Sequence, residues 1–167
     1  QIRTNALTPQ YGVDLGYLYA LREEKNKAKS QFENLIKEIT ANKQYIIDLA
    51  NAFLNRDFSE YALQTYTAGR KIMKGTYTFG LEMAEIYEKA KDYNKMMEEY
   101  VGLVESDPYT YLSIVQNLLQ TAISEDASGE KSAALKTVLL QKIQKAPETS
   151  LYSEILLWYS IQIKDFE

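Results

Sequence analysis

The sequence of 167 residues contains neither cysteine nor histidine. The common kinds of zinc, haem and iron–sulfur site need thiolate or imidazole ligands, so the chain cannot build them, and it cannot form disulfides. Catalysis that relies on a cysteine nucleophile or on a histidine base is excluded for the same reason. We therefore expect no cofactor and no metal, and we do not expect an enzyme.

Glycine and proline are also scarce, with seven and three residues respectively. A sandwich or barrel needs many tight turns, whereas long helices joined by short loops need few residues of either kind. Hydrophobic residues make up 46% of the chain and charged residues 25%, which is typical of a folded globular protein and not of a disordered chain. The composition predicts an all-α fold with a sizeable core.

Long apolar runs are lacking as well. No stretch approaches the roughly 20 apolar residues that a membrane-spanning helix needs. The net charge is −4, and residues 84–167 are more acidic, at −6, than residues 1–83, at +2. Because an acidic chain repels the phosphate backbone, we do not expect nucleic acid as a partner.

The sequence does contain an internal repeat, with a period of about 34 residues. Residues 15–32, 49–66 and 83–100 align with one another and share a pattern of a small residue, an aromatic, a small or slender residue and a second aromatic. The aligned positions are Gly16, Ala50 and Ala84; Tyr19, Phe53 and Tyr87; Ala28, Ala62 and Met96; and Phe32, Tyr66 and Tyr100. Small residues facing large ones allow two helices to approach closely, and a polar stretch such as "REEKN" makes the turn between them. A helix pair of this kind cannot bury its apolar face alone, so the pattern predicts pairs stacked on one another.

This pattern at this period resembles the tetratricopeptide repeat, a helix–turn–helix unit of about 34 residues. Pro108 stands where the family often closes a unit, and Tyr93 stands at the entry to a second helix. The chain departs from the family pattern in lacking an early tryptophan, in carrying Met96 instead of alanine and in closing its first two units without proline. The resemblance implies one domain over residues 1–167, a right-handed superhelical solenoid of antiparallel helix pairs with about nine helices.

The repeat becomes less regular after Pro108. We expect helices over residues 111–123 and 132–145, separated by the longer polar turn "SEDASGE", as a fourth and degenerate unit. The units then cover residues 9–42, 43–76, 77–110 and 111–147, and residues 148–167 form half of a fifth. In that half unit "KDFE" matches "KDYN" of residues 91–94, so Asp165 and Phe166 mark the entry to a second helix.

In the family that the chain resembles, the first helices of the units line a concave groove that binds peptides or partner helices. The resemblance therefore implies a groove that includes Tyr17, Leu21, Asn51, Leu54, Asn55, Glu85, Glu88, Lys89 and Leu119. The carboxylates in its middle suit a basic or amphipathic partner segment. The last helix lacks the second helix of its unit, so we expect Ile155, Trp158 and Tyr159 to be exposed and to allow self-association.

The function expected from these observations is that of a non-enzymatic scaffold that binds a protein or peptide. The alternative is a structural spacer or self-assembly segment of a larger multi-repeat protein. An α-helical hydrolase or transferase is a third alternative, although no site residues support it. The resemblance to long bacterial repeat proteins favours the cell envelope, on its periplasmic side.

Overall fold

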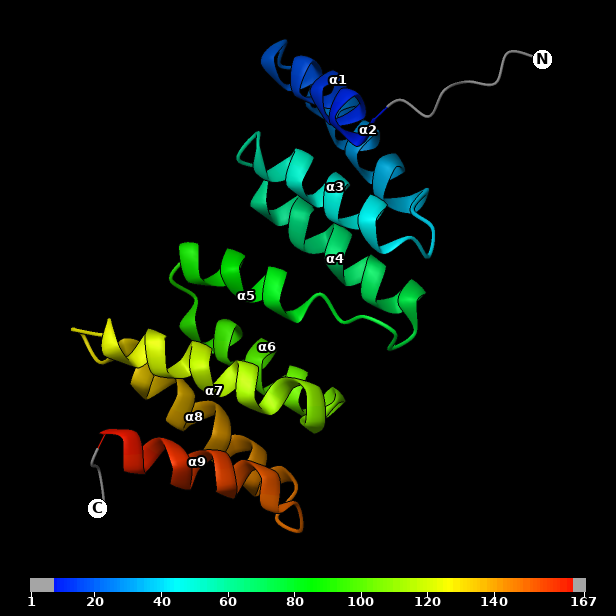
Figure 1. Ribbon diagram of the computed structural model, residues 1–167. Coiled ribbons are helices and arrows are strands. Elements are labelled where there is room, and N and C mark those ends of the chain that lie inside the picture. Colours follow the sequence, from blue (N-terminus) through cyan, green and yellow to red (C-terminus); the bar gives the residue numbers. More distant parts are fainter. Residues whose placement is uncertain (1–7, 164–167) are drawn as a thin grey trace. The chain divides into compact units, whose positions relative to one another are not determined.

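The computed structural model describes residues 8–163, and within this range it consists of nine α-helices without any strand (Figure 1). The predictions of an all-α fold and of about nine helices are confirmed. The chain divides into two compact units, Gln1–Phe79 and Gly80–Glu167. The helices are α1 (Pro9–Leu21), α2 (Lys25–Lys37), α3 (Lys43–Leu54) and α4 (Ser59–Met73) in the first unit, and α5 (Gly80–Lys89), α6 (Tyr93–Ser106), α7 (Pro108–Ser124), α8 (Glu130–Lys145) and α9 (Ser150–Ile163) in the second.

The first unit is two helix pairs packed on each other. α1 packs on α2 and α3 packs on α4, while α1 also contacts α3 and α2 contacts α4. The small and aromatic positions of the repeat meet as expected, because a Cβ atom at Gly16 would overlap the ring of Phe32. Phe32 in turn lies 5.3 Å from the ring of Phe53 and 4.9 Å from that of Tyr61. An aromatic cluster therefore fills the space between the two pairs.

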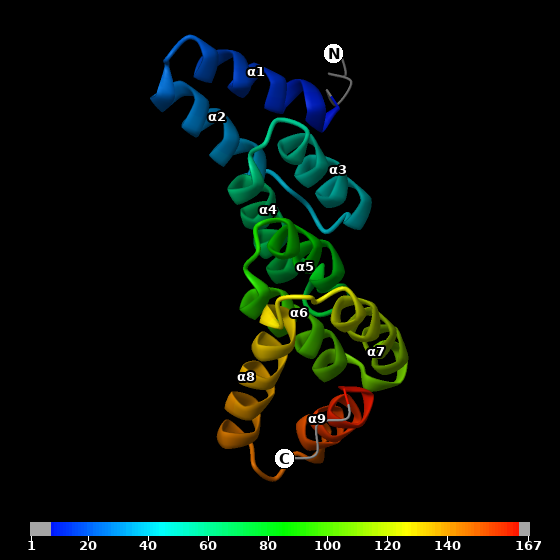
Figure 2. The same ribbon diagram turned by 90° about the vertical axis from the view of Figure 1, so that its left-hand side faces the viewer.

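The second unit is less regular. α5 and α6 form a pair, but α7 and α8 barely touch each other and both pack on α6, while α9 packs on α8. Figure 2 shows α7 and α8 diverging from the turn that joins them. Residues 111–147 therefore do not form a closed pair like the three before them. The buried residues that join these helices form one core, with Val101, Leu119, Leu135, Leu139 and Tyr159 at 0% exposure.

The turns inside the first three pairs share one geometry. Each has a residue with positive φ, and these residues are spaced by 34: Glu23 at 62°, Asp57 at 61° and Lys91 at 58°. In each turn the next backbone N–H donates to a carbonyl five residues earlier, over 2.9–3.0 Å, in the pairs Glu24 to Tyr19, Phe58 to Phe53 and Asp92 to Tyr87. Such a bond satisfies a carbonyl at a helix C-terminus that would otherwise have no partner. The period of the sequence repeat is thus a property of the backbone as well.

The turn between α7 and α8 has a different geometry. Its residue with positive φ is Gly129, which is the N-cap of α8, and the carboxylate of Asp126 accepts a hydrogen bond of 2.8 Å from the backbone N–H of Ser132. A longer turn was expected here, but α8 begins at Glu130 instead of residue 132. Pro108 was expected to close the third pair. It is instead the first residue of α7. There its missing N–H costs nothing, and Asp107 caps the helix by accepting from the backbone N–H of Thr110 over 3.2 Å.

Replacing Lys91 by glycine is expected to stabilise the second unit. A side chain in the left-handed region costs roughly 1–2 kcal/mol, and glycine avoids this cost but loses part of the gain to the greater entropy of the unfolded chain. We expect Lys91→Gly to raise the free energy of unfolding in urea by about 0.5–1 kcal/mol. Lys91→Ala keeps a Cβ atom and is the control, for which no such gain is expected. Equal stability of the two variants would contradict the strained turn.

Candidate functional site

Five of the residues expected to line a groove lie on α1 and α3 or at their ends. These are the first helices of the two pairs in the first compact unit. Tyr17 and Leu21 belong to α1, while Asn51 and Leu54 belong to α3 and Asn55 is its C-cap. Leu21 is 61% exposed, both asparagines are exposed, and Tyr17 and Leu54 are half-buried. α1 and α3 pack side by side (Figure 1), and we call the face that these two helices form the α1–α3 surface. Tyr17 and Asn55 are the two of the five residues whose side chains take part in contacts between α1 and the C-terminal end of α3.

A polar network fixes this surface. The guanidinium Nε of Arg56 donates to the carboxylate of Asp14 over 2.9 Å, and the amide of Gln10 donates to the same oxygen over 2.8 Å. The amide of Asn55 donates to the side-chain oxygen of Gln10 over 3.2 Å, which links α3 back to α1. The hydrogen bonds from Gln10 and Arg56 hold the pKa of Asp14 below its usual value. Sequence reasoning missed Gln10, Asp14 and Arg56, because no local pattern shows that two side chains so far apart in the chain form an ion pair.

The ring of Tyr17 is part of the same arrangement. The guanidinium carbon of Arg56 lies 4.7 Å from the centre of this ring, and the ring of Phe58 meets it edge-on at 6.2 Å. A cation over a tyrosine face contributes about 0.5–1 kcal/mol at an exposed site. Tyr17 is therefore held in place by contacts within the chain.

The three groove residues expected from the third repeat, Glu85, Glu88 and Lys89, lie on α5 in the second compact unit. A carboxylate oxygen of Glu85 lies 2.7 Å from Nζ of Lys89, and one of Glu88 lies 2.5 Å from Nζ of Lys131 on α8. The bond to Glu88 raises the pKa of Lys131. Burial, with the carboxylates of Glu88 and then Glu85, raises the pKa of Tyr100 to about 12. Both carboxylates that were expected to attract a basic partner thus already have lysine partners.

The expectation that Leu119 lines a groove is wrong, because this side chain is 0% exposed. Val115, Leu119 and Ala122 are spaced by four and three residues, so they share one face of α7. All three are buried in the core of the second unit. The sequence showed that this face is apolar, but not that it faces inward.

The expectation of exposed contact residues on α9 is wrong for two of the three. Ile155 is 2% exposed and Tyr159 is 0% exposed, because α9 packs this face on α8, and Trp158 is half-buried. The exposed apolar residues of α9 are instead Leu157, at 63%, and Ile161, at 51%. Asp165 and Phe166, which were expected to begin a further helix, lie outside the described residues.

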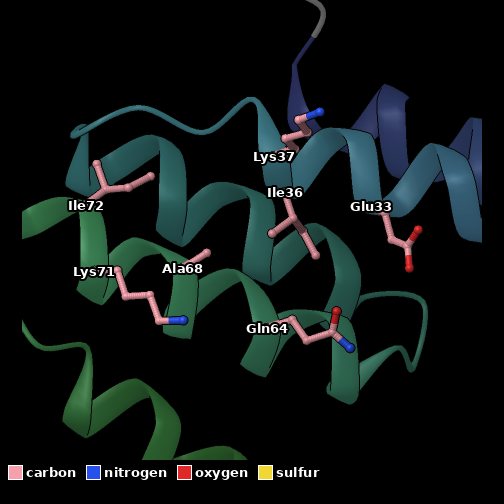
Figure 3. A pocket seen from close by; sticks show the side chains of 7 residues that line it. All are labelled: Glu33, Ile36, Lys37, Gln64, Ala68, Lys71 and Ile72. Carbon is pink, nitrogen blue, oxygen red and sulfur yellow. The ribbon is translucent and has the colours of Figure 1, made fainter.

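A pocket of about 360 Å³ lies between α2 and α4, the second helices of the first unit (Figure 3). Figure 3 shows Ile36 reaching from α2 toward α4, where Ala68 and the amino group of Lys71 lie. Ile72, Gln64, Glu33 and Lys37 complete the lining. Sequence reasoning missed this pocket. Lys37 and Lys71 are spaced by 34, which could have placed both on the same face of successive second helices.

Two further kinds of site are not found in residues 8–163. No group of three or more acidic side chains is arranged to hold a metal ion there. Nor does any helix in this range have the length and apolar character needed to cross a membrane.

Comparison with known proteins gives no relative: no family model, no curated protein and no solved structure matches this chain. The function is therefore argued from the chain's own residues. The tetratricopeptide resemblance and the solenoid remain proposals.

Proposed function

We propose that this chain is a non-enzymatic scaffold that binds a peptide or a helix of a partner protein. Its helix pairs are proposed to be tetratricopeptide-like units stacked as a solenoid. The support for this is that the turn geometry recurs with the period of the sequence repeat, together with the close contact of a small residue and an aromatic one. An origin in a bacterial envelope protein rests on the resemblance alone.

The α1–α3 surface is the observation that carries the proposal. Leu21 is an exposed apolar side chain on α1, and Asn51 on α3 carries an exposed amide that can both donate to and accept from a peptide backbone. The bonds among Gln10, Asp14 and Arg56 hold the two helices in register, so less order has to be imposed when a partner binds. We therefore place the binding site here and not at Glu85 and Glu88, whose charges are already paired.

The partner proposed for this surface is a segment that presents an apolar side chain beside uncharged backbone groups. On this surface Asp14 and Arg56 neutralise each other, with Nη2 of Arg56 2.8 Å from the carboxylate. A strongly charged segment would therefore find no countercharge at this pair. Affinity is expected to depend on Leu21 and Asn51 more than on ionic strength.

A peptide library selected against the whole chain tests this function. Peptides that bind are expected to lose roughly tenfold or more in affinity on Leu21→Asp, because a hot-spot residue at the centre of an interface contributes about 2 kcal/mol or more. Asn51→Ala is expected to weaken them by about two- to tenfold through the loss of a hydrogen bond. Both affinities are measured by titration calorimetry.

Leu140→Asp is the matched control, because Leu140 is a 49%-exposed leucine on α8, which belongs to the other compact unit. Its variant is expected to bind like the unchanged chain. Loss of binding on Lys71→Glu together with full binding on Leu21→Asp would move the site to the α2–α4 pocket. Failure to select any binding peptide would count against the function itself.

A further inference from the structure

One side of α1 is an exposed apolar stripe. Tyr11 is 62% exposed, Leu15 is 43% and Leu18 is 54%. Their spacing of four and three residues puts them on one face of the helix, and the exposed Arg22 continues this face one turn later. This face is distinct from the one that carries Tyr17 and Leu21.

The repeat shows that this stripe belongs to positions that the molecule buries elsewhere. The residues that correspond to Leu15 are Leu49 on α3 and Met83 on α5, which are 0% and 4% exposed. Those that correspond to Leu18 are Ala52 on α3 and Ile86 on α5, which are 2% and 5% exposed. In two other first helices of the chain these places are therefore covered by protein. On α1 they are open.

α9 also carries an exposed apolar face. Leu157 and Ile161 are more than half exposed, and the exposed Glu154 precedes Leu157 by three residues. The spacing of three and four puts all three on one face, while Ile155 and Tyr159 occupy the opposite, buried side. α9 therefore packs one apolar side against the core and exposes a second one.

We propose that the outer face of α9 in one copy of the chain packs antiparallel on the stripe of α1 in a second copy. With Leu18 placed on Leu157, the helical spacing puts Leu15 on Ile161 and brings Arg22 beside Glu154. All three pairs match in one register, two by apolar contact and one by opposite charge. The proposal does not depend on partner binding at the α1–α3 surface.

The charge of the two units supports the same occupant. Residues 1–79 carry a net charge of +3, whereas residues 80–167 carry −7. The unit that offers α1 and the unit that offers α9 therefore attract each other between copies, and two like units repel. A contact between two different faces is heterologous, so the expected products are head-to-tail assemblies, either open chains or closed rings of copies.

Light scattering over a range of concentrations tests the proposal. The unchanged chain is expected to grow in mass with concentration, while Leu18→Glu and Leu157→Glu are each expected to weaken association by more than roughly tenfold, because a charge would face an apolar residue. An equimolar mixture of the two variants should form a dimer and stop, since each variant keeps one intact face and the two faces fit each other. Leu140→Glu replaces an exposed leucine that lies on neither face, so this variant should associate like the unchanged chain.

A second pair of variants leaves the apolar faces intact. Arg22→Glu is expected to weaken association by about two- to fivefold, and adding Glu154→Arg is expected to restore it. A chain that stays monomeric up to about 1 mM, the weakest affinity worth assigning, would overturn the proposal. So would dimers of Leu157→Glu alone, which indicate a symmetric α1–α1 contact, and so would a mixture of the two glutamate variants that stays monomeric.

Discussion

Alanine at Phe53 is expected to lower the free energy of unfolding of the first unit by about 3–5 kcal/mol. Phe53 is 0% exposed, meets the ring of Phe32 edge-on at 5.3 Å and stacks on Tyr61 at 5.5 Å. The substitution removes the largest fully buried side chain of α3 from the contact between the two helix pairs and leaves a cavity. Because a domain of this kind is stable by only about 5–15 kcal/mol, the loss is a large part of the total.

Urea unfolding followed by circular dichroism measures this effect. Tyr11→Ala is the control, because it removes a 62%-exposed aromatic side chain from α1 in the same unit. Its effect on stability is expected to stay within about 0.5 kcal/mol. A loss of less than about 1 kcal/mol for Phe53→Ala would contradict the aromatic core of this unit.

Alanine at Tyr159 is expected to cost the second unit about 3–5 kcal/mol. The ring is 0% exposed and packs in the core that joins α6, α7, α8 and α9. Its hydroxyl oxygen is buried and has no hydrogen-bond partner within the described residues. Because an unpartnered buried hydroxyl costs free energy, Tyr159→Phe is expected to leave stability unchanged or to raise it by about 1 kcal/mol.

The fluorescence of the single tryptophan, Trp158, follows this unit during unfolding. Leu157→Ala on the same helix is the control, with an expected effect within about 0.5 kcal/mol because Leu157 is 63% exposed. If Tyr159→Phe cost as much as Tyr159→Ala, the hydroxyl would have a partner after all. If neither variant lost stability, α9 would not be docked as described.

Much of the first unit could be predicted from its sequence. Polar stretches such as residues 22–26 mark its turns, and the aligned small and aromatic positions predict the contact between Gly16 and Phe32, which the structure contains. Both are local or periodic features, so a repeat read along the chain is enough to find them. The α1–α3 surface is only partly predictable, because Arg56 and Asp14 meet through tertiary packing.

The structure of the second unit is predicted less well from its sequence. Periodicity predicts that α7 and α9 are helices, but it does not predict that Leu119 and Tyr159 face inward. α9 carries apolar residues on two opposite sides, so its pattern does not indicate which side is buried, and its neighbours decide this. The divergence of α7 and α8 has the same cause, since both take their contacts from α6.

The sequence by itself determined the helical class, the period of the repeat and the turn that recurs with it, because each depends on residues close together in the chain. Tertiary structure decided which apolar faces are covered, that Glu88 pairs with Lys131 and that Asp14 pairs with Arg56. These contacts join side chains 43 and 42 residues apart, and their formation depends on how whole helices pack. The apolar faces left open on α1 and α9 follow from that packing, and they are where a second copy is expected to bind.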